Sequence, residues 1–137
     1  MNPELEQKLY IEFPKLFAQK DLDNSKSLMG YGCCCGDGWY AILRGACERT
    51  QAVCDKEGFQ VEFVQVKGKF DRLRVYYDLK VADAYSKTID GFDAIVGGIL
   101  EEAEGESLET CEVCGGILEG AEEVRAKRTP CRCWEDV

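Results

Sequence analysis

Histidine is absent from the 137-residue chain, although cysteine is abundant. The absence removes the commonest general base of enzymes and every catalytic triad that uses an imidazole. The chain also lacks a basic segment followed by an apolar one at its N-terminus, and no apolar stretch approaches the length of a membrane span. We therefore expect a cytoplasmic, noncatalytic protein with no membrane partner.

Basic residues are too few to balance the acidic ones. The chain has 17 Lys and Arg residues against 26 Asp and Glu residues, and its formal net charge is −9. Proteins that coat nucleic acids neutralise phosphates with Lys and Arg, so this charge argues against nucleic acid as the partner. The 45% hydrophobic and 31% charged residues are normal for a globular domain with its own core.

The number of cysteines is nine, which is odd and does not suit a disulfide framework in a reducing cytoplasm. Metal binding or burial explains them better. Cys47 and Cys54 fall on the apolar stripe of a helix expected from Trp39 to a stop at Gly58. We expect these two thiols to pack in the core as small hydrophobic groups.

The remaining local patterns predict an α+β fold, with helices packed on a small antiparallel β-hairpin and a zinc-knuckle segment at the C-terminus. Asn2 is a cap for a first helix over residues 3–13. Residues 80–106 have helical spacing, with a break expected near residue 91 or 97 because of glycines. We expect an α+β domain over residues 1–106 and a cysteine-rich tail over residues 107–137.

Residues 59–78 are typical of two β-strands joined by a glycine-containing turn. We expect Lys67 to pair with Arg72, because this register gathers the apolar side chains on one face. That face would carry Val64, Val66, Leu73 and Val75.

The opposite face of this hairpin would be basic and aromatic. Its guanidinium groups suit phosphate or carboxylate, and its rings could stack on a planar ligand. We predict it as the site for an anionic small molecule or an acidic partner, formed by Phe63, Lys67, Lys69, Arg72, Arg74 and Tyr76. The alternative is an ordinary solvated sheet face whose lysines protect an edge.

The C-terminal tail contains a Cys-x-x-Cys pair followed by two glycines and, sixteen residues later, a Cys-x-Cys pair. Such spacing predicts a Cys₄ zinc site, in which the turn brings two thiolates onto one ion. Four thiolates leave no position for a catalytic water, so the zinc would be structural. The expected ligands are Cys111, Cys114, Cys131 and Cys133. A redox-active CxxC is the rival interpretation, but no βαβ pattern surrounds it.

Three adjacent cysteines stand before a Gly-Asp-Gly turn in "YGCCCGDGWYA", at the end of a predicted loop over residues 21–38. Successive side chains diverge, so we do not expect these thiols to share one ion. Asp37 is the expected N-cap of the helix that follows, with Trp39 as its core anchor. Two alternatives stay open: a reactive thiolate at Cys33, Cys34 or Cys35, and an anion bound at the glycine turn.

Three blocks of the sequence, "CGDGWYAIL", "VQVKGKFDRLRVYYD" and "AEGESLETCEVCGG", resemble a group of small bacteriophage-encoded proteins that carry a C-terminal zinc knuckle. The family pattern has a later Cys-x-x-His where this chain has Cys131 and Cys133. The motif positions that match are Gly38, Trp39, Lys67, Lys69, Phe70, Leu73 and Arg74. The resemblance implies a phage origin and action in the cytoplasm of a host cell.

Together these features predict a noncatalytic phage-type binding protein. It would act as a counter-defence factor that sequesters a nucleotide-derived signal or blocks a host protein. The alternative is a zinc-containing regulator that binds nucleic acid, and a homo-oligomer is compatible with either.

Overall fold

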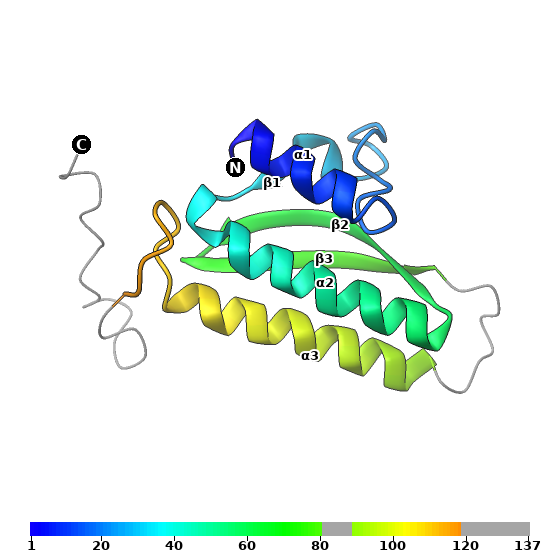
Figure 1. The fold of residues 1–137 in the computed structure, drawn as a ribbon. Helices are drawn as coiled ribbons and strands as arrows, with labels where there is room; N and C mark the ends of the chain where they lie inside the picture. The colour runs from blue at the N-terminus through cyan, green and yellow to red at the C-terminus, as the bar shows by residue number, and fades with distance from the viewer. Residues whose placement is uncertain (81–88, 119–137) are drawn as a thin grey trace.

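A computed structural model describes residues 1–80 and 89–118. It contains three helices and a three-stranded mixed sheet, which confirms the α+β class (Figure 1). In chain order the elements are α1 (Pro3–Glu12), a 3₁₀ turn (Met29–Tyr31), β1 (Cys33–Cys34), a 3₁₀ turn (Asp37–Trp39), α2 (Tyr40–Glu57), β2 (Gln60–Lys69), β3 (Arg72–Lys80) and α3 (Ile89–Leu108).

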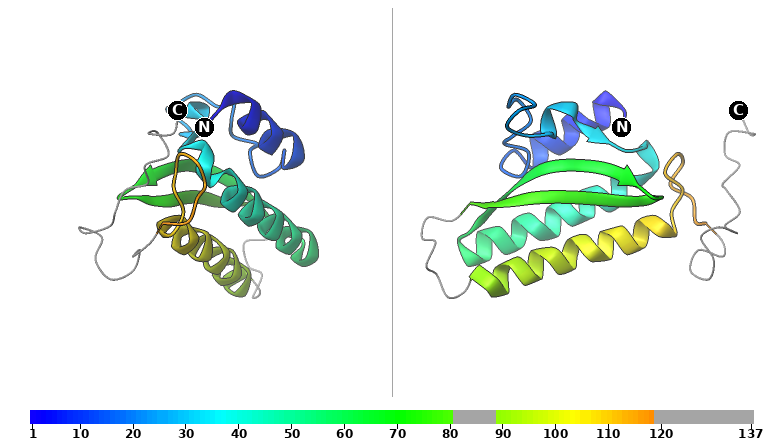
Figure 2. Two further views of the ribbon diagram at one scale, coloured as in Figure 1. Left: turned by 60° about the vertical axis from the view of Figure 1, so that its left-hand side comes forward. Right: turned by 180° about the vertical axis from the view of Figure 1, so that it is seen from behind.

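The sheet has the strand order β1-β2-β3, and α2 and α3 lie side by side against it (Figures 1 and 2). The largest side chains of the core, including Trp39, Phe63 and Phe92, are almost completely buried. The segment after α1 reaches the edge of β2 that faces away from β3, where the N–H of Phe63 donates to the carbonyl of Leu16 at 2.7 Å.

The sequence predicted an antiparallel hairpin alone, but the sheet of the structure is mixed. Residues Cys33–Cys34 form β1, which pairs in parallel with Val66 and Lys67 of β2. A two-residue strand is too short to show an alternating pattern, so it was predicted as part of a loop.

The start of α1 and the end of α2 follow the local sequence. The side chain of Asn2 accepts a hydrogen bond from the N–H of Glu4 at 2.8 Å, as expected for an N-cap. Gly58 ends α2 in the left-handed conformation, with φ of 76°. Cys47 and Cys54 are buried on the inner face of α2, as predicted.

Helix α3 runs without interruption from Ile89 to Leu108, so the expected break near residue 91 or 97 is wrong. Each interior glycine costs about 1 kcal/mol in helix propensity, but the helix buries Phe92, Val96 and Ile99, and such burial is worth more. Among residues 1–80 and 89–118, no helix has the length and apolar character needed to cross a bilayer.

The predicted register of the hairpin is also wrong. Lys67 lies opposite Arg74 rather than Arg72, and Lys69 lies opposite Arg72. The strands are joined by a two-residue turn at Phe70 and Asp71, whose φ angles are 53° and 63°. This geometry usually selects Asn-Gly, so nothing in the sequence marked the turn at these positions. The shift is of two residues, so it preserves which β3 side chains share a face.

Candidate functional site

Five of the six residues predicted for the basic face do lie on one side of the hairpin. The cross-strand pairs are Lys67 with Arg74 and Lys69 with Arg72, while Gln65 lies opposite Tyr76. Phe63 does not join them. An irregularity between residues 63 and 65 inserts an extra residue in β2, which turns Phe63 to the other face. There it is fully buried, with its ring edge-on to Phe17 at 5.3 Å.

The two arginines of the face are already compensated within the protein. Nη1 of Arg72 and Nε of Arg74 lie 3.4 and 3.1 Å from the same carboxylate oxygen of Glu104 on α3. Because β3 is the outer strand, these side chains reach α3 around its free edge. Arg74 lines a groove between β3 and α3, but its charge there is balanced by Glu104.

Helix α3 also contacts β3 through two further hydrogen bonds. The N–H of Leu73 points away from β2 and donates to Oγ of Ser107 at 2.8 Å. The hydroxyl of Tyr77 donates to the carboxylate of Asp93 at 2.6 Å. These contacts, with those of Glu104, partly cover an edge that would otherwise offer a template for another strand.

Lys67 and Lys69 differ from the arginines in that no ion pair within residues 1–80 and 89–118 involves them. Each ammonium lies near an aromatic ring instead. Nζ of Lys67 is 5.7 Å from the ring centre of Tyr76, and Nζ of Lys69 is 5.6 Å from that of Phe70. The positive charge that the hairpin presents outward therefore comes from these two lysines.

Residues 109–118 form a loop, hereafter the knuckle loop. The first two predicted zinc ligands, Cys111 and Cys114, lie on a turn within it. The N–H of Gly115 donates to the carbonyl of Cys111 at 2.9 Å, and the N–H of Gly116 approaches Sγ of Cys114 at 3.4 Å. Gly115 has a φ of 79°, which explains a glycine at this position. A thiol pair on a turn with an amide directed at sulfur fits one half of a tetrahedral zinc site.

The other two expected ligands, Cys131 and Cys133, lie outside the described residues. Within those residues, no three Cys, Asp or Glu side chains gather where they could hold a metal ion. The predicted domain boundary after residue 106 falls inside α3, and the knuckle loop follows that helix directly.

The knuckle loop packs on the Gly-Asp-Gly turn, here called the glycine loop (residues 36–38). The N–H of Gly38 donates to the carbonyl of Glu112 at 2.7 Å, and the N–H of Gly36 donates to its carboxylate at 3.2 Å. Nε1 of Trp39 donates to the carbonyl of Thr110 at 2.9 Å. The sequence did not predict this contact between the two loops. The glycines present in both loops are the one sequence feature that relates to it.

Glycines are required where these loops meet. A Cβ at Gly38 would overlap the carbonyl of Cys111 and lie 2.5 Å from the nitrogen of Gly115, and a Cβ at Gly36 would overlap Glu112. On the hairpin, a Cβ at Gly68 would lie 2.9 Å from the carboxylate of Glu112. Backbone therefore packs directly on backbone, and Glu112 contacts both the glycine loop and the hairpin.

Asp37 does not cap α2, contrary to the prediction. Its carboxylate accepts a hydrogen bond from the main-chain N–H of Asn2 at 2.6 Å. The N-cap of α2 is Trp39, which makes no side-chain capping bond because an indole has no acceptor for the helix N–H groups. Its N–H donates to the knuckle loop instead. The expected role of Trp39 as a core anchor is confirmed, since only 2% of the residue is exposed.

The three adjacent cysteines have different environments. Cys33 and Cys35 are buried, and Cys34 is exposed. Burial raises the pKa of Cys35 from its ordinary 9.0 to about 12, and burial likewise raises the pKa of Cys33 far above its ordinary value. These two thiols stay protonated at neutral pH, which favours a packing role over a nucleophilic one.

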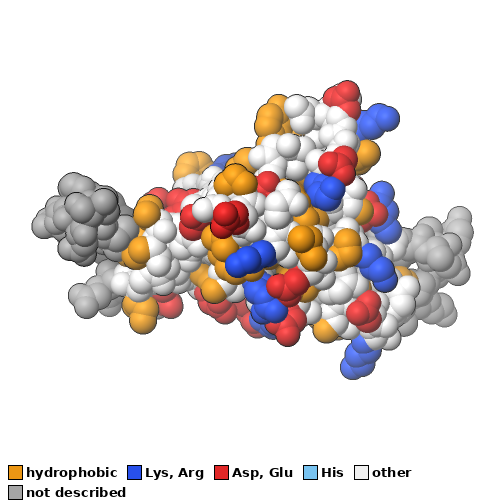
Figure 3. Space-filling view, turned by 45° about the horizontal axis from the view of Figure 1, so that its top comes forward, with side chains coloured by type: hydrophobic (Ala, Val, Ile, Leu, Met, Phe, Trp, Pro, Cys, Tyr) orange, Lys and Arg blue, Asp and Glu red, His pale blue; other side chains and the backbone are white. Residues whose placement is uncertain are grey.

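The glycine loop, the hairpin turn and the knuckle loop thus meet at one end of the molecule, where the hairpin turn lies beside the knuckle loop (Figures 1 and 2). Large apolar residues are exposed there: Phe70 at 73%, Val113 at 68% and Ile117 at 90%. Hydrophobic side chains are visible on this left-hand end in Figure 3. No family model, curated protein or solved structure matches the chain.

Proposed function

We propose that this chain is a noncatalytic binding protein that docks on another protein through the end where the hairpin turn, glycine loop and knuckle loop meet. The convergence of these three segments carries the proposal. Large apolar side chains exposed together on a protein surface are characteristic of an interaction site rather than of a chemical centre. The buried, protonated thiols of Cys33 and Cys35 support the noncatalytic part.

A host protein is the partner that the resemblance to phage proteins suggests, and blocking it would be a form of counter-defence. Sequestration of a nucleotide-derived signal has less support, because both arginines of the predicted anion site are engaged by Glu104. An incoming phosphate would have to compete with that carboxylate.

Structural zinc is part of the proposal. Cys111 and Cys114 would hold it together with Cys131 and Cys133, and it would supply a cross-link that fixes the knuckle loop. The residues of this chain already position that loop through Glu112 and Thr110.

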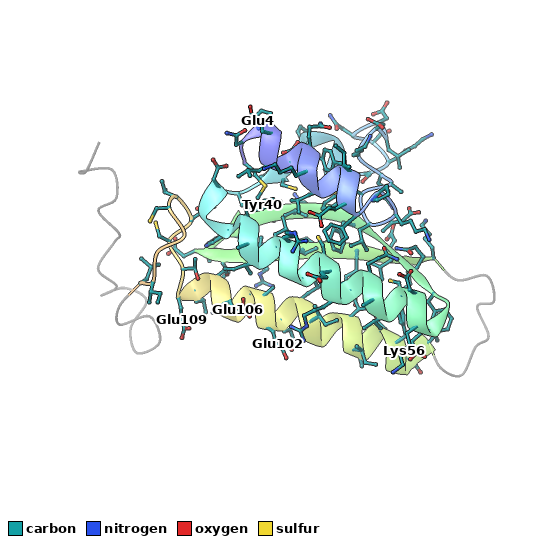
Figure 4. The ribbon with its side chains drawn as sticks, in the orientation of Figure 1. Glu4, Tyr40, Lys56, Glu102, Glu106 and Glu109 are labelled. Carbon is teal, nitrogen blue, oxygen red and sulfur yellow. The ribbon has the colours of Figure 1, made fainter. Side chains whose placement is uncertain are left out.

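Photo-crosslinking in a bacterial host tests the docking proposal. A photoreactive amino acid at position 70 should form a covalent adduct with one host protein, and the same group at position 56 should not. Lys56 is a suitable control because it is exposed near the other end of α2 (Figure 4). Equal or absent adducts from both positions would contradict the proposal.

Two further measurements separate the competing functions. A rise in melting temperature with cyclic dinucleotides or ADP-ribose derivatives would support sequestration instead. Salt-dependent retardation of DNA or RNA would support the nucleic-acid regulator.

A further inference from the structure

The turn residue Phe70 combines three properties that an aromatic residue rarely has together. It is 73% exposed, it has a φ of 53°, and it occupies the first position of a two-residue hairpin turn. An L-residue other than glycine, asparagine or aspartate is disfavoured in this conformation. A residue that costs stability and buries little surface in the chain itself indicates selection for something outside the chain.

The lysines beside Phe70 define the charge of its surroundings. Lys67 and Lys69 have no carboxylate partner in the part of the chain that the structure describes. Asp71, the second residue of the turn, is an exposed acid, so two lysines outnumber one acid beside Phe70. Glu104 is shared by the two arginines, and the carboxylate of Glu112 accepts from Gly36. The hairpin turn therefore presents an aromatic ring flanked by positive charge on a protein of net charge −9.

We infer that the hairpin turn binds an acidic protein segment that carries an apolar side chain, with Phe70 as the apolar contact and Lys67 and Lys69 as the charge contacts. This inference rests on the proposed function and names the partner chemistry for that surface. Nucleic acid fits less well, because the adjoining knuckle loop exposes the apolar side chains of Val113 and Ile117. Phosphates gain nothing from apolar neighbours, whereas an apolar side chain of a protein segment can pack on them.

The test measures binding of a fluorescein-labelled peptide to the full chain. The peptide consists of aspartate and glutamate, with phenylalanine or leucine at every third position. We expect saturable binding with a Kd below about 1 mM that weakens on raising salt. A peptide with the acids replaced by lysine, and a single-stranded DNA of the same charge, should each bind at least about tenfold more weakly, about 1.4 kcal/mol.

Variants of the turn distinguish recognition from stability. Phe70→Asn should raise the melting temperature by about 2–4 °C, because asparagine tolerates the left-handed conformation, and should still weaken peptide binding at least about tenfold. Asp71→Gly relieves the same turn without removing the ring, and it removes an exposed negative charge, so it should raise the melting temperature and bind the acidic peptide at least as tightly as the unaltered chain.

Charge variants complete the design. The double change Lys67→Glu and Lys69→Glu should abolish peptide binding, and Lys56→Glu should leave it unchanged. Absence of binding by the unaltered chain, or equal loss in Lys56→Glu, would overturn the inference. If the crosslinking experiment at position 70 succeeds while the acidic peptide fails, the docking proposal stands and the partner chemistry is wrong. If DNA binds as tightly as the peptide, the inference is likewise overturned.

Discussion

The main-chain N–H of Gly38 donates a 2.7 Å hydrogen bond to the carbonyl oxygen of Glu112, which joins two loops separated by more than half of the chain. The bond is possible because neither Gly36 nor Gly38 has a side chain at the contact. It holds the knuckle loop beside the hairpin, where Gly68 lies close to the carboxylate of Glu112. The proposed docking surface depends on this junction.

Gly38→Ala should displace the knuckle loop or destabilise the chain. The added Cβ would overlap the carbonyl of Cys111 and the nitrogen of Gly115. Both are backbone atoms, which cannot rotate away as a side chain could. We expect a loss of more than about 2 kcal/mol in the free energy of unfolding, comparable to an overpacked core. Urea unfolding followed by circular dichroism measures it.

Gly45→Ala is the matched control for that change. Gly45 lies inside α2, and a Cβ there would meet nothing within 4 Å. Alanine should stabilise the helix by about 0.5–1 kcal/mol. A similar loss of stability in both variants would show that the glycine loop has no special packing role.

Ser107→Ala should cost about 1–3 kcal/mol of stability despite the small size of the change. The hydroxyl of Ser107 is fully buried, accepts from the N–H of Leu73 and donates to the carbonyl of Glu104 at 2.5 Å. Alanine would leave the Leu73 N–H without its acceptor. Thermal unfolding should show the loss, whereas Thr110→Val, which removes an exposed hydroxyl bonded to Glu106, should change stability by less than about 0.5 kcal/mol.

Removal of the proposed zinc ion should change the fluorescence of Trp39. Its indole N–H donates to Thr110 in the knuckle loop, so loosening that loop should change the emission of a tryptophan that is otherwise buried. The measurement uses a Trp134→Phe background, so that Trp39 is the sole tryptophan, and compares spectra before and after chelation. Cys114→Ser should lower the zinc content measured by mass spectrometry. Full zinc content in that variant would contradict the ligand assignment.

The sequence predicted correctly those features that depend on interactions between residues close together in the chain. The caps at Asn2 and Gly58 and the buried stripe of α2 depend on residues within a few positions of one another, and each is found in the structure. The hairpin was predicted as a pair of strands, but its register depends on a turn at Phe70 and Asp71 that contains no glycine. The placement of Phe63 failed for the related reason that a bulge is not visible as a change of composition.

The candidate site could be predicted only in pieces. The lysines and arginines of one face follow from strand alternation, and the Cys-x-x-Cys turn follows from its spacing. The pairing of both arginines with Glu104, and the contact of the glycine loop with Glu112, join residues that are distant in the chain. Such contacts depend on how the helices and strands pack, which no short window of sequence contains.

The stability of the chain should fall as pH rises above about 9. Burial raises the pKa of Cys35 from 9.0 to about 12 and raises the pKa of Cys33 as well, so both thiols stay neutral in the folded state after they have ionised in the unfolded chain. The unfolded state then binds fewer protons, and each such thiol lowers the free energy of unfolding by up to about 1.4 kcal/mol per pH unit. The contribution is fully present below pH 9 and is lost progressively between about pH 9 and 12. Melting temperatures from pH 7 to pH 10.5 should show the decline, and Cys35→Ala should make it shallower. Cys34→Ala, which changes an exposed thiol, should leave the slope as it is; an identical slope in all three proteins would contradict the assignment.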